Sequence, residues 1–97
     1  MLTGKQRSYL RSLANNLQPI FQVGKGGISD NMIKQFSDAL EARELIKATV
    51  LRNAESETKL VCEEIAESTQ SQIVQVIGSK FVLYKRSEKN AVIELPR

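Results

Sequence analysis

A short run of three glycines and a lysine is the part of the sequence best suited to binding chemistry. Residues 23–29 read VGKGGIS and separate an apolar segment from one with helical spacing. Glycines let a backbone approach a ligand closely, and the start of a helix offers unpaired N–H groups and a partial positive charge. Lys25 adds a full charge. The run predicts either a phosphate-binding loop or a plain tight turn, and spacing alone leaves both open.

Nucleotide-binding motifs fit this run poorly. A Walker loop needs G-x-x-x-x-G-K-[ST], whereas here the lysine follows the first glycine. A dinucleotide loop needs G-x-G-x-x-G, but Ser29 occupies the third glycine position. The acid about 20 residues further on is Glu44, at the wrong end of its expected strand. Residues 24–27 do have the G-x-x-G form with which KH domains clamp a nucleic-acid backbone.

Side chains for catalysis or metal binding are scarce. The sequence has no histidine, which excludes a histidine-based triad, general base or zinc site. Cys62 is the single cysteine, and it falls on the expected buried side of a helix without an imidazole to activate it. Glu63 and Glu64 are adjacent on that helix and point in different directions, with no further ligand set. We therefore expect no enzyme, no metal and no cofactor.

Charge is distributed in blocks along the chain. Residues 1–52 carry eight Lys and Arg against four Asp and Glu, residues 53–71 one against five, and residues 72–97 five against two. Balances of +4, −4 and +3 give the net charge of +3. If the acidic segment is a helix on one side of the fold, the basic residues can share another side. A basic side favours a polyanion such as nucleic acid; the alternative is a mixed, solubilising surface.

Apolar periodicity predicts the elements that position these residues. A capping box, Thr3 to Gln6, begins a helix that ends near residues 15–16. Strands are expected at 19–23, 45–51, 73–77, 81–86 and, as a short last one, 91–95; two more helices are expected at 30–43 and from about 56 to 69. The order α-β-α-β-α-β-β predicts an α/β fold of the α+β two-layer type, with three helices and a mixed four-stranded sheet, in one domain over residues 1–97.

Signals for membranes and export are missing from the sequence. No apolar run approaches the ~18 residues of a membrane span, and residues 1–7 offer no apolar stretch for a signal peptide. A single cysteine fits a reducing compartment. We expect a cytoplasmic protein with no membrane partner.

Five segments, taken together and in order, resemble the YhbY-type CRM family, named for chloroplast RNA splicing and ribosome maturation. They are LTGKQRSYLRSLA (2–14), VGKGGIS (23–29), ELIKATVL (44–51), VIGSKFVLYKR (76–86) and IELPR (93–97). The resemblance implies a bacterial stand-alone RNA-binding module, similar in fold to the C-terminal domain of bacterial translation initiation factor three with an added N-terminal helix. Stand-alone members are associated with precursors of the large ribosomal subunit, and plant relatives with group II intron splicing. It implies rRNA as the partner. We also expect no small-molecule substrate and a monomer.

The resemblance also implies which residues meet RNA. It makes a contact loop of Gly24, Lys25, Gly26 and Gly27, with Lys5, Arg7 and Arg11 as basic neighbours. The segment LYKR matches the family's Leu-Tyr-Arg ending with an inserted lysine, so either Lys85 or Arg86 is the equivalent of its arginine. For the three cations of the first helix, the alternative is simply the solvated face of that helix.

Three further residues are candidates from their own positions. Lys34 lies one helical turn beyond the glycines, and Lys80 lies at the turn between the last two predicted strands. Tyr84 is suited to stacking on an unpaired base, although a tyrosine alternating with apolar residues in a strand also fits a core. Clamping of the backbone by these residues would position RNA without reading its sequence.

A rival hypothesis is a protein–protein module that docks on assembling ribosomes through ribosomal proteins. Such a module needs an exposed apolar patch, for which residues 91–93, Ala-Val-Ile, are the candidate.

Overall fold

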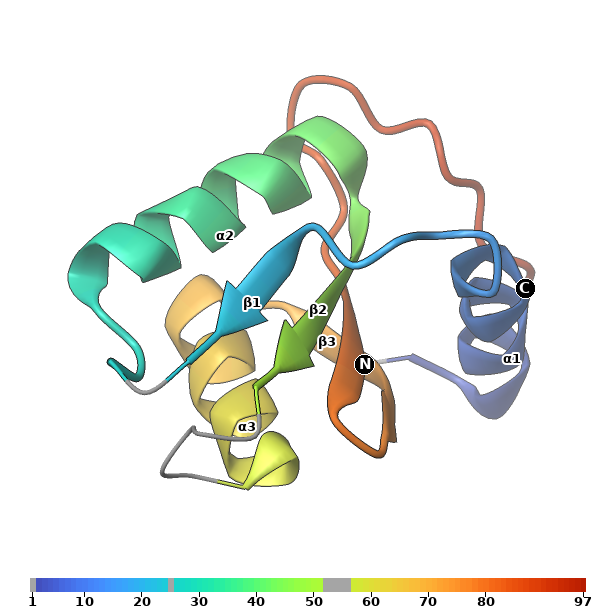
Figure 1. The fold of residues 1–97 in the computed structure, drawn as a ribbon. Helices are drawn as coiled ribbons and strands as arrows, with labels where there is room; N and C mark the ends of the chain where they lie inside the picture. Colours follow the sequence, from blue (N-terminus) through green and yellow to red (C-terminus); the bar gives the residue numbers. More distant parts are fainter. Residues whose placement is uncertain (1, 25, 52–56) are drawn as a thin grey trace.

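The computed structural model describes residues 2–24, 26–51 and 57–97, and its elements follow the predicted order (Figure 1). They are α1 (Gly4–Ala14), β1 (Phe21–Val23), α2 (Asp30–Arg43), β2 (Leu45–Val50), α3 (Thr58–Thr69), β3 (Gln72–Ile77) and β4 (Lys80–Tyr84). The capping box is present, because the Thr3 hydroxyl accepts from the Gln6 N–H and the Gln6 side chain accepts from the Thr3 N–H. Among these helices none is long and apolar enough to cross a membrane.

The four strands form one mixed sheet in the order β1-β2-β4-β3. β1 runs parallel to β2, and β4 is antiparallel to both of its neighbours. The mixed sheet confirms the predicted fold class. Its order places β4, the last strand, inside the sheet and β3 at an edge.

Each face of the sheet has its own apolar core, which follows from the alternation of side chains along a strand. Helices α2 and α3 cover one face, where Phe36, Cys62 and Ile65 pack on Ile46 and Phe81. Helix α1 lies on the opposite face (Figure 1). There, Leu10 and Ala14 pack against a second cluster of Leu45, Val74, Val82 and Tyr84. The three exposed glutamates of α3, at 63, 64 and 67, are therefore separated from α1 by the sheet.

The expected strand at 91–95 is wrong. This segment belongs to an irregular C-terminal tail, residues 85–97, that crosses from the end of α2 towards α1. The N–H groups of Val92 and Ile93 donate to Glu44 Oε1, at 2.7 and 2.9 Å. Because a buried carboxylate takes these donors, they are not available for a sheet ladder. The expected helix start at Ser56 lies outside the described residues, and the described part of α3 begins at Thr58.

Two glutamates near the end of α2 hold the C-terminal tail. Glu44 is fully buried, and its other oxygen accepts from the Ser87 N–H at 2.9 Å. Glu41 accepts from the Ser87 hydroxyl and from the N–H groups of Glu88 and Lys89. Glu44 has a positive φ of 66°, which turns the chain from α2 directly into β2. The tail is thus fixed by carboxylates instead of by strand pairing.

Candidate nucleic-acid interface

The glycine loop joins the carboxyl end of β1 to the start of α2. Gly27 has φ +70°, a conformation that favours glycine, and its N–H donates to the Gly24 carbonyl at 3.0 Å. Gly26 and Gly27 are exposed and have open space around them. Ser29 then caps α2 by accepting from the Met32 N–H at 3.1 Å. The predicted loop between strand and helix is therefore present, while Lys25 lies outside the described residues.

The turn between β3 and β4 lies at the same end of the sheet as the glycine loop. Val23 pairs with Val50, and the Leu51 N–H donates to the Val23 carbonyl at 2.8 Å. On the other side of β2, the Val50 N–H donates to the Ser79 carbonyl at 2.7 Å, and Thr49 pairs with Lys80. The exposed Lys80 is thus separated from the glycine loop only by the end of β2.

Beside these two turns, α1 leaves part of its sheet face uncovered. We call this part the open sheet surface; it consists of Gln22, Lys47, Thr49, Gln75, Ile77 and Lys80, which are neighbours across the paired strands and are exposed or half-buried. A hollow of about 210 Å³ opens here between Lys47, Lys80 and Asn15, the residue that caps the end of α1. Two cations, several side-chain amides and the Thr49 hydroxyl can therefore meet one ligand on this surface.

Lys47 is the cation of this surface that was not among the predicted site residues. Its signal was present in the sequence, since Lys47 and Thr49 alternate with the apolar Ile46 and Ala48 in β2. Alternation predicts that a residue faces away from one core. It does not tell whether a second helix covers the other face, and α1 covers only part of it.

The cations of α1 are divided between the two ends of the sheet. Lys5 and Arg11 are exposed and Arg7 is half-buried. Arg11 lies one turn before Asn15 and hence on the side of the helix that reaches the open sheet surface. Lys5 is six residues earlier, about 9 Å further along the axis. The glycine loop lies across the sheet from α1 (Figure 1), so the structure does not bring all the predicted contacts together.

Lys34 is exposed on α2, one turn after the glycine loop. It belongs to the helix that covers the other face of the sheet from the open sheet surface. A chain of RNA that touched both would have to pass over the end of the sheet at the glycines.

Tyr84, Lys85 and Arg86 lie at the opposite end of β4 from Lys80, about 13 Å away along the strand. Tyr84 is 5% exposed and packs in the core beneath α1. Of the two alternatives for this ring, base stacking or a place in the core, the burial of Tyr84 favours the core. Burial also raises the pKa of Tyr84.

The two cations that follow Tyr84 differ in their surroundings. Lys85 Nζ donates to the Thr69 carbonyl at the end of α3, at 3.1 Å, where a cation also complements the helix dipole. Arg86 is exposed; its positive charge partly opposes the raised pKa of Tyr84 and contributes to the lowered pKa of Glu44. Of these two cations, Arg86 is the more exposed and so the better placed to meet a ligand.

Two features of the described residues bear on catalysis and metal binding: the surroundings of Cys62 and the spacing of metal-ligating side chains. Burial raises the pKa of the Cys62 thiol to about 12, with a smaller contribution from the charge of Glu63. A thiol of this kind is a poor nucleophile. In the ranges 2–24, 26–51 and 57–97, no group of three or more metal-ligating side chains comes together.

Comparisons with known proteins identify a family and two similar relatives. The family model for the CRS1/YhbY (CRM) domain matches residues 2–85. The "Probable RNA-binding protein YqeI" of Bacillus subtilis is 59% identical over 96 residues, covering 99% of this chain and all of that protein. An "RNA-binding protein" of Haemophilus influenzae is 39% identical over 97 residues, covering 99% of this chain and 96% of the relative.

A solved structure shows the same fold. The solution structure of the hypothetical protein SAV1595 from Staphylococcus aureus superposes with a TM-score of 0.81 at 59% identity, and the match covers 99% of this chain and all of that one.

Proposed function

Because this chain belongs to the CRS1/YhbY (CRM) domain family, we propose that it is a non-catalytic RNA-binding protein that holds rRNA in precursors of the large ribosomal subunit and assists their assembly. Relatives across its full length carry RNA-binding in their names. The association of stand-alone family members with large-subunit precursors supports the choice of rRNA.

The observation that carries the proposal is the placement of Lys80 beside the glycine loop, with Lys47 on the same face of the sheet. Both lie on the open sheet surface, and the paired ends of β1 and β2 bring that surface to the exposed glycines 26 and 27. Glycines permit close approach of a phosphate, and cations beside them supply the charge. We propose that the RNA backbone passes over this end of the sheet, with Lys25 as a further phosphate ligand.

Such contacts fix the position of an RNA without reading its bases. Specificity then comes from the shape of the folded RNA, which must present phosphates to the loop and the sheet at once. The acidic side of α3 opposes binding in the reverse orientation, since its three exposed glutamates repel phosphate.

The proposal is tested by binding to a structured large-subunit rRNA fragment at several salt concentrations. Neutralising four to six phosphates gives a decline of log K with log salt of about three to five. In Lys25→Ala this decline becomes shallower by about 0.7–0.9 and affinity falls. Lys59→Ala removes the same charge from the exposed side of α3 and leaves both values unchanged. Binding of the wild type that does not depend on salt would refute the proposal.

A protein–protein adaptor is the second candidate, favoured by one observation. Val92 in the C-terminal tail is 75% exposed, whereas its neighbour Ile93 packs against the core beneath α1. The expected patch at 91–93 is thus reduced to two exposed side chains, Ala91 and Val92. Co-purification with pre-ribosomal particles that survives RNase and is lost in Val92→Ser would support this alternative; loss under RNase would support direct contact with RNA.

A further inference from the structure

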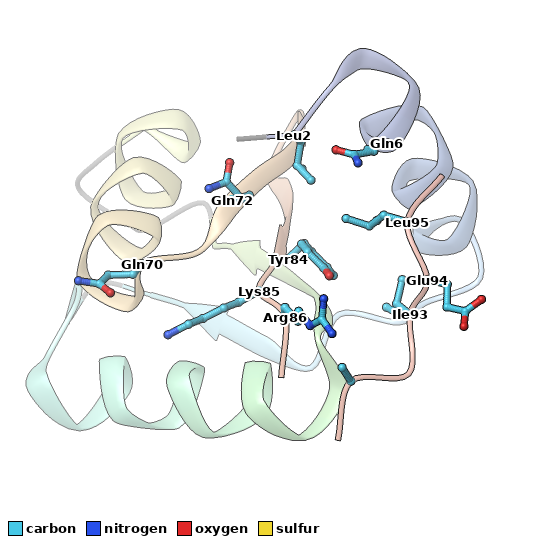
Figure 2. Close-up of a pocket in the computed structure, with 11 residues that line it drawn as sticks. Leu2, Gln6, Gln70, Gln72, Tyr84, Lys85, Arg86, Ile93, Glu94 and Leu95 are labelled. Carbon is cyan, nitrogen blue, oxygen red and sulfur yellow. The ribbon is translucent and has the colours of Figure 1, made fainter. Parts of the chain in front are cut away.

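A large hollow among the described residues lies at the end of the sheet far from the glycine loop. This groove of about 660 Å³ lies between the start of α1, the end of β4 and the C-terminal tail (Figure 2). Its volume falls in the range of small-molecule sites, roughly 300–1,000 Å³. Leu2, Ile93 and Leu95 give it apolar walls, and Gln72, Tyr84 and Arg86 add polar groups.

Tyr84 directs a polar atom into this groove. The residue as a whole is 5% exposed, and its hydroxyl forms no hydrogen bond with any part of the chain that the structure describes. Because no buried side-chain polar atom among the described residues lacks a partner, the hydroxyl is accessible from the groove. Figure 2 shows the hydroxyl turned towards the space beside Arg86. A hydroxyl at the wall of an open groove can donate one hydrogen bond and accept another, so a ligand with a hydrogen-bonding edge can bind to it.

The charges around the groove favour an anion at one end. Arg86 is exposed and close enough to Tyr84 for its charge to act on that side chain. The carboxylate of Glu44 accepts hydrogen bonds from three backbone N–H groups of the tail. These bonds leave the Arg86 guanidinium able to pair with an anionic ligand. Glu94, the other acid at the groove, extends outward from the tail in Figure 2.

The groove offers apolar walls, a hydrogen-bonding group and a cation, and together these three can recognise a nucleotide. A base has apolar faces and a polar rim, and its phosphate pairs with guanidinium. We propose that this groove holds one unstacked nucleotide of the bound RNA, with the base between the apolar walls, its edge on the Tyr84 hydroxyl and its phosphate on Arg86. The inference rests on the proposed RNA-binding function and adds a base-contacting site to a backbone clamp.

The test follows backbone amide NMR shifts of the labelled full chain on titration with adenosine and uridine 5′-monophosphates. Ribose 5-phosphate serves as the probe without a base. We expect shifts at residues 84–95 and 2–6 with the nucleotides and weaker binding of ribose 5-phosphate. Tyr84→Phe lowers nucleotide affinity about fivefold, and Arg86→Gln lowers it about tenfold. Lys89→Gln, an equal charge change on the tail outside the groove lining, leaves it unchanged.

Other outcomes overturn the inference. Equal affinity for ribose 5-phosphate would make the groove an anion site without a place for a base. Shifts with an acidic peptide and none with nucleotides would assign it to a protein partner.

Measurements with rRNA separate this inference from the proposed function. If rRNA binds the wild type and both groove variants equally, the nucleotide site is wrong and the clamp at the glycine loop stands. If nucleotides bind the groove but rRNA does not bind the chain, both the RNA source of the ligand and the proposed function are wrong. A loss of rRNA affinity in Tyr84→Phe and Arg86→Gln, and not in Lys89→Gln, supports both.

Discussion

Glu44 is a fully buried carboxylate whose partners are backbone N–H groups of the C-terminal tail. Burial by itself raises the pKa of this group, but hydrogen bonds from Ile93, Ser87 and Val92 outweigh it, and the pKa ends below its usual value of 4.5. Hydrogen bonds to a charged group stabilise more than neutral ones. The side chain therefore acts as an anchor for the tail and needs to be ionised to do so.

We expect Glu44→Gln to lower the free energy of unfolding by about 2 kcal/mol at pH 7. The folded pKa is lowered, so the contribution of the carboxylate is present above pH 4.5 and is lost as pH falls through the folded value. The difference in free energy of unfolding between wild type and Glu44→Gln should then decrease below pH 4.5. Urea denaturation from pH 7 to pH 3 measures it, with Glu64→Gln on the exposed side of α3 as control. A gap that stays constant over this range would contradict the anchor role.

Cys62 illustrates how packing determines reactivity. The thiol is fully buried between the sheet and its two covering helices, and its pKa is raised to about 12. At pH 8 we expect an aromatic disulfide reagent to modify the folded protein more than about a hundredfold slower than the urea-unfolded chain. Absorbance of the released thiolate follows the reaction. Equal rates in the two states would show that the site opens readily.

At the scale of elements, the glycine loop owes its shape to one residue. Gly27 has φ +70°, and although a Cβ would have open space there, this backbone conformation is strained for other residues. Gly26 also has open space and carries no such φ. The loop therefore depends on the second of the two glycines for its turn into α2.

This difference predicts unequal effects of two alanine substitutions. Gly27→Ala should lower the free energy of unfolding by about 1–2 kcal/mol, and Gly26→Ala should change it by less than about 0.5 kcal/mol. Both are measured by urea denaturation. If Gly26→Ala lowers RNA affinity without lowering stability, the role of Gly26 is to allow a phosphate to approach the backbone closely. Equal destabilisation by both substitutions would contradict the assignment of the turn to Gly27.

For the whole molecule, the sheet separates the acidic helix α3 from two basic residues of the sequence, Lys47 and Lys80. The exposed glutamates of α3 are on one side of the sheet, and the open sheet surface is on the other. Arg11 lies on α1 and donates to the Ser8 hydroxyl on the same helix, while Arg86 lies at the far end of β4. The molecule measures 39 × 26 × 22 Å, so an RNA reaching both ends contacts much of its length.

The double variant Lys47→Ala, Lys80→Ala tests the open sheet surface. We expect weaker binding of the rRNA fragment and a salt dependence shallower by about 1.4–1.8, the share of two phosphates. Filter binding at several salt concentrations measures both quantities, and circular dichroism checks that the variant is folded. Lys59→Ala is the matched control. An unchanged slope would move the RNA path away from this surface and towards α1 or α2.

Local patterns in the sequence determined the elements and the polar or apolar side of each. The capping box at Thr3, the cap at Ser29 and the stripes of α2 and α3 depend on neighbours within a few residues, and they are confirmed. The same local reading identified a glycine loop before a helix. It failed at residues 91–95, where strand-like residues give their N–H groups to Glu44, 48 or 49 residues away in the chain.

Contacts between distant residues were decided only by the tertiary structure. The pairing of β4 with β2 brought Lys80 next to Thr49 and made Lys47 part of a surface, and the packing of α1 buried the ring of Tyr84 while leaving that surface open. The passage of the tail across the end of β4 formed the groove. These arrangements depend on which faces meet after folding, because a residue's own pattern shows that it leaves one core but not what covers it on the other side.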